Sequence, residues 1–418
     1  MKMICKLLLM LLPSLFFSCS KEPGTGASLD DIVFNGPEKI ELSVGESIEL
    51  SLGIPSGLKV DITWVYDRKV LSNSDKLTFS ADSPPEGILT VILKDQNKKT
   101  RTIERTVLVL RKDGGYKVVG YLPQYKNTTS IPWEKLTHVH LAFAKVKSDG
   151  TLDDAGVRKV FGTLSKTASS YGVRLVLSLG GGGGSDEQAA ITAALLSEVA
   201  RKNIVRCAVK TVRDLSLDGI DLDYEDWDWG KGTGNIAKQA AVLDLLTQLR
   251  AELGNSAILS AAASVNALEN GCYSSEIVSL LDYITIMTYD KTGTWSTSEG
   301  PHAPYEYFTG ASITAINLGI PNEKIIPGIP FYGRVFPSGK PANSYIIAYS
   351  DIVKTYSGAE NKDSILSDHL WYDGLPMVSK KAQYIKDHKL GGVMIWEITQ
   401  DATSASASLL NAINEILN

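Results

Sequence analysis

The sequence predicts an α/β protein, a (β/α)8 TIM barrel that follows an N-terminal immunoglobulin-like β-sandwich. From residue 114 onward, apolar segments of strand length alternate with stretches of helical periodicity over about 300 residues, which is typical of such a barrel. Before residue 113, apolar and polar residues alternate with period two between turn-forming residues, as half-buried strands do. A doubly wound sheet is the alternative for the second part, but that fold rarely needs eight evenly spaced strands.

The composition supports a folded protein of more than one domain. The chain has 418 residues, more than the roughly 100–200 residues of an average domain. Hydrophobic residues make up 44% and charged residues 21%, which argues against wholesale disorder. With 42 Lys and Arg against 47 Asp and Glu, the net charge is −5, so nucleic acid is not an expected partner.

The first 18 residues have the pattern of a signal peptide. Lysines precede an apolar run, 7–17, that is shorter than the roughly 20 residues of a membrane-spanning helix. The segment 15–19 resembles a bacterial lipobox, and the resemblance implies cleavage after residue 18 and lipidation of Cys19. We therefore expect a lipid-anchored protein of the bacterial cell envelope, at the outer membrane, with surface exposure left open. A plain secretory signal is the alternative.

Residues 19–30 are expected to form a flexible tether, and residues 31–113 the sandwich. Trp64 lies on a middle strand, as in immunoglobulin-type sandwiches, although no cysteine is present to bridge the two sheets. The segment has no evident catalytic cluster, so a spacer is the favoured role and glycan contact the alternative. The expected strands are 40–44, 48–52, 60–66, 76–80, 88–93 and 103–110.

Residues 114–418 are expected to form the barrel. Its eight expected strands are 118–122, 138–144, 173–179, 219–225, 258–263, 283–289, 325–331 and 391–396. Amphipathic helices are expected at 189–215, 236–253, 378–388 and 409–417. Chemistry in such barrels lies at the carboxyl ends of the strands, and polar and aromatic residues gather at four of these ends: 221–225, 287–290, 332–334 and 396–397.

The fourth strand carries three acids on one face. Because side chains alternate along a strand, Asp221, Asp223 and Glu225 point into the barrel while the apolar residues between them face the helices. Their Cα atoms are about 6.6 Å apart, so the three carboxylates cannot all ionise cheaply, and the outermost acid should hold a proton near neutral pH. A protonated carboxyl group there could protonate a departing glycosidic oxygen.

The same geometry limits the mechanism. Neighbours on one strand cannot flank a sugar ring from opposite sides, so the attack must come from another carboxylate or from the substrate. An N-acetyl group on the sugar can supply the attacking oxygen, with Asp223 steadying its amide. The alternative, a calcium loop, fails because a loop begun at Asp221 would place Asp226 where glycine is required.

The segment 218–225 is similar to the active-site motif of glycoside hydrolase family 18, the chitinases and endo-β-N-acetylglucosaminidases. Five further motifs agree in order: 120–121, 178–181, 287–290, 328–334 and 391–396. The resemblance covers about 116–418 and nothing before residue 113. It implies that Glu225 is the acid/base and that Asp223 stabilises the N-acetyl group as an oxazolinium forms. It also implies that Asp221 exchanges a hydrogen bond with Asp223, and that Tyr289 holds the acetyl carbonyl.

The resemblance implies further residues around the sugar. Substrate contacts are implied for Tyr121, Met287, Asp290, Trp295, Tyr332, Arg334 and Trp396, with Trp396 as the floor of the innermost subsite. Behind them, Asp218 and Ser178 are implied to support the acids. Packing alone is the alternative for Trp396, Met287 and Tyr332. Trp227 and Trp229 are either platforms beside the acid or loop residues, and this stays open.

Other patterns in the sequence bear on cofactors, disulfides and the depth of the groove. The glycine run 180–184 is not followed by Lys-Ser/Thr, so close backbone packing is expected rather than phosphate binding. His138 and His140 lack a third ligand, so no metal or cofactor is expected. Pairing of Cys207 with Cys272 is left open. Only about 57 residues separate Arg334 from Gly391, too few for the extra α+β insertion of many processive family members, so a shallower groove is expected.

The leading function is therefore a retaining, substrate-assisted hydrolase of β-1,4 linkages after N-acetylglucosamine, most simply a chitinase. An endo-β-N-acetylglucosaminidase that cuts the chitobiose core of N-glycans is the close alternative. A glycan-binding protein without hydrolysis is the alternative of another class, but it predicts loss of the acid, and Glu225 is present. A monomer is expected.

Overall fold

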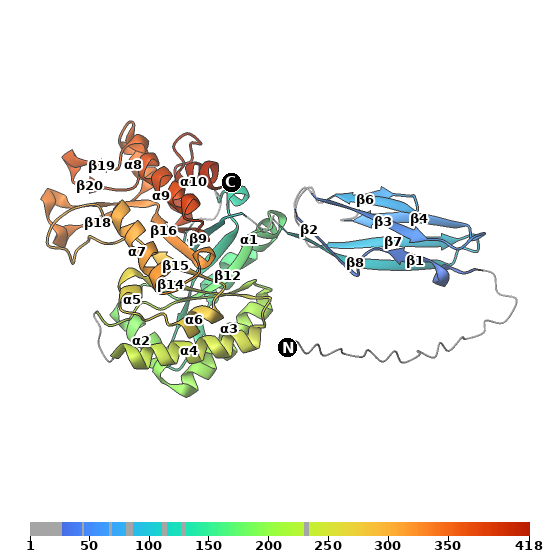
Figure 1. The fold of residues 1–418 in the computed structure, drawn as a ribbon, viewed down its shortest axis with the longest axis horizontal. Helices are drawn as coiled ribbons and strands as arrows, with labels where there is room; N and C mark the ends of the chain where they lie inside the picture. The colour runs from blue at the N-terminus through green and yellow to red at the C-terminus, as the bar shows by residue number, and fades with distance from the viewer. Residues whose placement is uncertain are drawn as a thin grey trace, which may run out of the picture. The chain divides into compact units, whose positions relative to one another are not determined.

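The structure is a computed structural model, which describes residues 27–43, 46–66, 69–80, 87–110, 115–126, 131–229 and 234–418. The expected signal peptide, Cys19 and most of the expected tether lie outside the described residues. Helices that are both long and apolar enough to span a membrane do not occur in the described ranges. Contacts within the chain divide it into two units, with the main boundary near residue 107 (Figure 1).

The N-terminal unit consists of two antiparallel sheets. One has the order β1-β3-β6, and the other has the order β2-β8-β7-β4-β5. Trp64 is fully buried on β4, and its ring lies 6.0 Å from that of Phe34 on β1, which joins the two sheets. The strands are β1 (Val33–Asn35), β2 (Lys39–Ser43), β3 (Ser47–Gly53), β4 (Val60–Tyr66), β5 (Lys69–Ser72), β6 (Lys76–Ser80), β7 (Gly87–Asp95) and β8 (Thr100–Leu110). The immunoglobulin-like classification of this unit stays a prediction.

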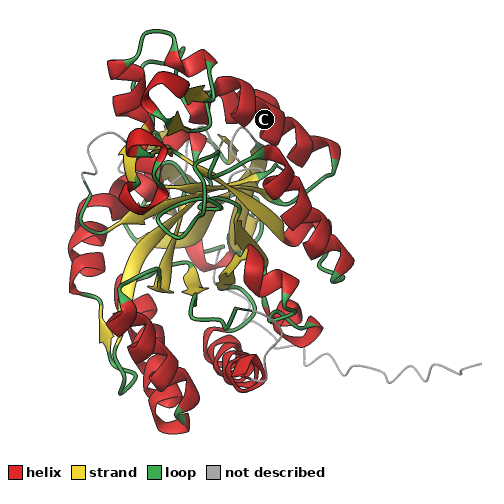
Figure 2. Ribbon diagram, turned by 90° about the vertical axis from the view of Figure 1, so that its left-hand side faces the viewer, coloured by secondary structure: helices red, strands yellow, loops and turns green. Residues whose placement is uncertain are grey.

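The second unit is a closed barrel of eight parallel strands. Each strand pairs with the next, and the last, β21, pairs with the first, β9, which in turn pairs with β10. The strands are β9 (Lys117–Pro123), β10 (His138–Val146), β12 (Arg174–Gly180), β13 (Gly219–Asp223), β14 (Ile258–Ser264), β15 (Tyr283–Met287), β16 (Ile325–Pro330) and β21 (Gly392–Trp396). The predicted (β/α)8 barrel is therefore confirmed, and Figure 2 shows its strands surrounded by helices.

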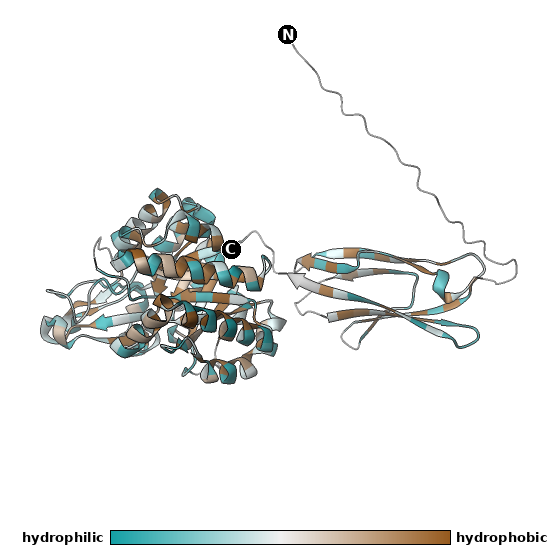
Figure 3. Ribbon diagram, turned by 90° about the horizontal axis from the view of Figure 1, so that it is seen from below, coloured by the Kyte–Doolittle hydropathy of each residue, from teal (hydrophilic) through white to brown (hydrophobic). Residues whose placement is uncertain are grey.

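The helices around the barrel bury an apolar stripe against the strands, and Figure 3 shows apolar and polar residues side by side on them. They are α1 (Ala155–Ser170), α2 (Ser185–Leu196), α3 (Glu198–Leu215), α4 (Gly234–Leu253), α5 (Val265–Glu269), α6 (Ser275–Leu280), α7 (Tyr305–Asn317), α9 (Leu375–Asp387) and α10 (Leu409–Leu417). The prediction of one helix over 189–215 is wrong. Ser197 has an extended backbone and its side chain accepts a hydrogen bond from the N–H of Ala200, so it ends α2 and caps α3.

A small α+β element follows the seventh barrel strand. Its antiparallel sheet has the order β18-β17-β20-β19, and one short helix follows β18. The bounds are β17 (Tyr332–Val335), β18 (Tyr345–Ala348), α8 (Tyr349–Thr355), β19 (Ser364–Ile365) and β20 (Leu370–Trp371). The interval, expected to be too short for the extra α+β insertion of many processive family members, thus holds a small α+β element, because strands of two to four residues need little chain. The shallow groove stays a prediction.

Candidate active site

The fourth barrel strand presents two of the predicted acids to the interior of the barrel. Asp221 and Asp223 lie on β13, while Ile220 and Leu222 between them are buried against the helices. The strand ends at Asp223, two residues earlier than predicted, so Glu225 stands in the segment just beyond its carboxyl end. This places one acid deep in the barrel, one at the end of the strand and one at the mouth.

Asp221 is surrounded by hydroxyl groups. Tyr121 and Ser178 donate to its Oδ2 at 2.9 and 2.7 Å, and Ser260 donates to its Oδ1 at 2.7 Å. The two serines lie directly opposite Asp221 on the neighbouring strands β12 and β14. Burial by itself raises the pKa of Asp221, but the nearby His140 and the serine hydrogen bonds outweigh burial and lower it. Asp221 is therefore the ionised member of the group.

Asp223 is the unpaired member. Its Oδ1 is buried and has no hydrogen-bond partner among the described residues. Burial, followed by the charges of Glu225 and Asp221, raises the pKa of Asp223 well above its usual range. The hydrogen bond expected between Asp221 and Asp223 is absent from the described residues, where the hydroxyl groups of Tyr121, Ser178 and Ser260 donate to Asp221. The carboxyl group of Asp223 therefore either keeps a proton or presents its unpaired oxygen to a substrate.

Glu225 rests against the glycine loop that follows β12. Burial and then the charge of Asp290 raise the pKa of Glu225 to about 7, against the lowering effect of a hydrogen bond from the Gly182 backbone N–H. A Cβ atom at Gly182 would lie 3.0 Å from the Oε1 of Glu225, so the bare backbone lets the carboxyl group approach. The glycine run is thus used for close packing, and Glu225 is poised to exchange a proton near neutral pH.

Two tyrosines and a methionine line the same end of the barrel. Tyr289 lies just past β15, and its ring contacts that of Tyr332 edge to face at 6.2 Å. Burial and the charges of Asp223 and Glu225 raise the pKa of Tyr289 well above its usual range, so its hydroxyl stays a donor. Met287 ends β15 and packs with the inner cluster of the barrel. Tyr332 is buried on β17.

Trp396 forms the end of the eighth strand and packs between two aromatic rings. Its ring stacks on Phe143 at 5.7 Å and meets Tyr121 at 5.8 Å. Tyr121 is almost fully buried, and its hydroxyl is committed to Asp221, so it supports the acids rather than presenting a free face for a sugar. Phe143 was not singled out from the sequence, although it lies near the carboxyl end of a predicted strand.

A second charged group lies beside Glu225. Arg334 donates to Asp290 Oδ1 at 2.8 Å, and the guanidinium group lies 5.3 Å above the ring of Trp295, which is 60% exposed. The buried His302 places Nδ1 3.6 Å from the same carboxylate. Burial alone raises the pKa of Asp290, but His302 and Arg334 lower it to about 2. His302 was missed from the sequence, because nothing in a lone histidine on a loop indicates its partner.

The structure shows where Trp227, Trp229 and Asp218 lie. Trp227 packs on Tyr224 and Tyr273 in the core, whereas Trp229 is 88% exposed. Asp218 lies before β13, accepts the N–H of Leu175 at 2.7 Å and contacts Arg174, so its predicted support of the acids is wrong. Three residues along a strand from Asp221, it points away from the barrel interior.

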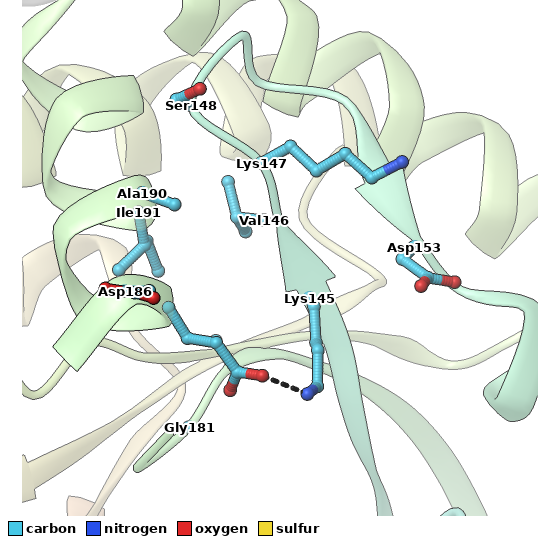
Figure 4. Close-up of a pocket in the computed structure, with 11 residues that line it drawn as sticks. Lys145, Val146, Lys147, Ser148, Asp153, Gly181, Asp186, Ala190 and Ile191 are labelled. Atoms are coloured by element: carbon cyan, nitrogen blue, oxygen red, sulfur yellow. Dashed lines mark hydrogen bonds and ion pairs between the residues drawn. The ribbon is translucent and has the colours of Figure 1, made fainter. Parts of the chain in front are cut away.

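The pocket of Figure 4 lies apart from the acids. Its volume is about 450 Å³, and it lies between the end of β10, the strand β11 (Leu152–Asp153) and the start of α2. Lys145 and Glu187 form an ion pair there, and of the glycine loop only Gly180 and Gly181 line it. The described residues contain no cluster of His, Cys, Asp or Glu that could hold a metal, and there Cys207 and Cys272 are free thiols.

Comparisons with known proteins agree with this arrangement. Residues 117–401 match the family described as glycosyl hydrolases family 18. Chitinase 1 of Aphanocladium album is 28% identical over 350 residues, which cover 68% of this chain and 80% of the relative. The crystal structure of a chitinase from Bacteroides thetaiotaomicron is 28% identical, with a TM-score of 0.64, and covers 73% of this chain and 97% of its own.

A further solved structure, the chitinase ChiB from the chitin utilization locus of Flavobacterium johnsoniae, is 29% identical with a TM-score of 0.61. It covers 72% of this chain and 94% of its own. The family match spans more than half of the chain, and it begins and ends within the unit that forms the closed barrel. The chain therefore belongs to glycosyl hydrolase family 18 and is a chitinase-like glycoside hydrolase.

Proposed function

We propose that this protein is a retaining hydrolase that cleaves β-1,4 linkages after N-acetylglucosamine, most simply a chitinase. The observation that carries the proposal is the pair of Glu225 and Asp223, whose pKa values are both raised at the mouth of the barrel. A carboxyl group that keeps its proton near pH 7 can act as general acid, and the unpaired oxygen of Asp223 is free for a polar group of the substrate.

The proposed reaction has two steps. Glu225 gives its proton to the leaving glycosidic oxygen while the acetamido oxygen of the sugar attacks C1, which forms an oxazolinium ring. Asp223 stabilises the amide N–H as positive charge develops, and the hydroxyl of Tyr289 donates to the acetamido oxygen. Glu225 then takes a proton from water, the water oxygen attacks C1, and the ring opens with retention of the β configuration.

We place the sugar contacts on the residues around these acids. Arg334 and Asp290 form a charged pair that can bond to hydroxyl groups, and the exposed ring of Trp295 offers an apolar face beside them. Trp396 is partly exposed and can support the innermost ring. Aromatic faces with a few fixed polar groups are the usual construction of a sugar site.

The substrate is tested by product analysis on chitooligosaccharides and on a high-mannose glycoprotein. We expect release of β-anomeric N-acetylglucosamine oligomers from the chitooligosaccharides, followed by NMR of the anomeric protons before mutarotation. Cleavage of the glycoprotein alone would assign the protein as an endo-β-N-acetylglucosaminidase instead. Binding of both substrates without release of product from either would overturn the enzyme assignment in favour of a glycan-binding protein.

We also propose that the mature protein starts at Cys19, is lipid-anchored in a bacterial envelope, and uses residues 31–113 as a spacer between residues 19–30 and the barrel at 114–418. The change Cys19→Ala should move the protein from the membrane fraction to the soluble fraction, because a buried acyl chain contributes about 0.8 kcal/mol per CH₂ group. Cys207→Ala is the matched control and should leave the distribution unchanged. Equal membrane association of the Cys19→Ala variant would contradict lipidation.

A further inference from the structure

His140 is a buried, titratable residue that the proposed reaction does not use. It lies on β10, points into the barrel and is fully buried. Its Nδ1 stands 3.3 Å from Oδ2 of Asp221, the ionised member of the acidic strand. Among the described residues, Asp221 is the only charged side chain that His140 approaches this closely.

The other side of the ring is also held. Nε2 of His140 lies 2.8 Å from the hydroxyl of Tyr283, and the two rings are stacked with centroids 6.0 Å apart. The ring of Tyr121, which donates to Asp221, meets His140 edge to face at 4.7 Å. His140 is thus fixed in orientation by aromatic rings on β9 and β15, with one nitrogen on a phenol and the other on a carboxylate.

These partners determine where the ring carries its proton. An ionised carboxylate only accepts hydrogen bonds, so the Nδ1 that faces Asp221 is favourable only as N–H. Burial and the charge of Asp221 raise the pKa of Tyr283 well above its usual range, so its hydroxyl remains protonated and can either donate to Nε2 or accept a hydrogen bond from it. Nε2 is thus held by the Tyr283 hydroxyl, while Nδ1 has no hydrogen-bond partner among the described residues and faces Asp221 through the 3.3 Å contact alone.

We propose that His140 is a positioning residue that holds Asp221 ionised, and thereby keeps the strand's remaining protons on Asp223 and Glu225. The negative charge of Asp221 is one of the causes that disfavour ionisation of Asp223. If Asp221 took up the proton instead, its negative charge would no longer disfavour ionisation of Asp223. Asp223 and Glu225 would then no longer be the protonated acids of the strand. The role of His140 in catalysis rests on the proposed hydrolase function.

Other titratable groups also face this part of the barrel. His138 lies on the same face of β10, Tyr121 comes from β9, Asp221 from β13 and Tyr283 from β15. Lys117 and Arg174 lie close enough to lower the pKa of His138, together with burial and His140. His138 bonds through Nδ1 to Thr137 at 2.8 Å rather than to an acid, so it is the natural control.

Two substitutions of His140 test the hydrogen-bond donor toward Asp221 separately from the packing of the ring. The amide nitrogen in His140→Asn falls near the position of Nδ1 and keeps a donor toward Asp221, whereas in His140→Gln the amide falls near Nε2 and Tyr283. We expect kcat of His140→Gln to fall about ten-fold with little change in KM, and the acidic limb of its pH profile to move up by about one unit. His140→Asn and His138→Gln should keep the wild-type limb.

A second measurement does not depend on hydrolysis. Because the folded-state pKa of Asp221 is lowered, its ionisation stabilises the fold above the unfolded pKa, and this contribution is lost as pH falls through the folded value. The part of the stability difference between wild type and His140→Gln that comes from Asp221, from urea unfolding, should therefore be steady near neutral pH and shrink as pH falls below about 4. In an Asp221→Asn background the same substitution should leave only the pH dependence of the histidine's own titration, so the contribution of Asp221 is the difference between the two backgrounds.

The outcomes are distinct. Equal losses in His140→Asn and His140→Gln, with unmoved pH limbs and the same pH dependence of stability in both Asp221 backgrounds, would mean that the ring only fills space and would overturn the role. If His140→Gln does not fold, His140→Leu is compared with His140→Asn in the same two measurements. If the wild-type protein hydrolyses neither substrate, the proposed function fails, while the unfolding cycle still decides whether His140 holds Asp221 ionised.

Discussion

Replacing Glu225 with glutamine should reduce kcat by about 10²–10⁴-fold on chitooligosaccharides, because the amide cannot give a proton to the leaving oxygen or take one from water. Burial and Asp290 raise the pKa of Glu225 to about 7, so the wild-type enzyme should itself lose activity as pH rises through that value. Glutamine has the same shape as glutamate, so KM should change little. Steady-state kinetics across pH 4–9 measures both effects.

A matched exposed residue controls for the substitution itself. Glu276 lies on the exposed face of α6, and Glu276→Gln should keep both kcat and the alkaline limb. The Glu225→Gln protein should also unfold at the wild-type temperature or above, since it removes a carboxyl group that is buried at a cost. Full activity in Glu225→Gln would show that another group supplies the proton.

The change Asp223→Asn should lower kcat by about 10²–10³-fold, comparable to the removal of one group that stabilises charge in a transition state. Asp223 has a buried oxygen without a partner among the described residues, at the end of β13 and next to the acid. An amide at this position can still contact the substrate, but unlike the carboxyl group of Asp223 it can never ionise to offset the positive charge of an oxazolinium. The loss should therefore appear in kcat rather than in KM.

The control for this prediction is Asp244→Asn on α4, which changes a partly exposed ion pair with Arg201 of α3 and should leave kcat unchanged. Asp223→Asn also relieves repulsion inside the barrel, so its stability should equal or exceed that of the wild type. An Asp223→Asn protein with wild-type kcat would contradict assistance by the substrate, because the developing charge would then need another stabilising group.

The barrel could be predicted because its signals are local. Each strand is a short apolar run, and the eight strands match their predicted positions within a few residues, since burial on both faces leaves little freedom in composition. The acids could be predicted for the same reason, because alternation along one strand puts Asp221 and Asp223 on one face. The break at Ser197 could not, because the helical periodicity continues across it and only the capping hydrogen bond marks the boundary.

What could not be predicted depends on neighbours that are distant in the chain. The contact of His140 with Asp221 joins β10 to β13 across the barrel interior, and that of His302 with Asp290 joins two positions in one long loop. Alternation along β10 puts His138 and His140 on one face, but nothing in the sequence indicates that only His140 reaches an acid. The hydrogen bond expected between Asp221 and Asp223 was wrong for the same reason, since the competing hydroxyl groups come from three other strands.

The contact between Gly182 and Glu225 bears on how such an enzyme could be silenced in evolution. A methyl group at position 182 would stand 3.0 Å from Oε1, so the carboxyl group of Glu225, the side chain nearest to that methyl, would have to shift. A displacement of this kind can impair catalysis without impairing binding. A substitution at Gly182 is therefore a second route, besides loss of the acid, by which a descendant of this barrel could keep glycan binding without hydrolysis.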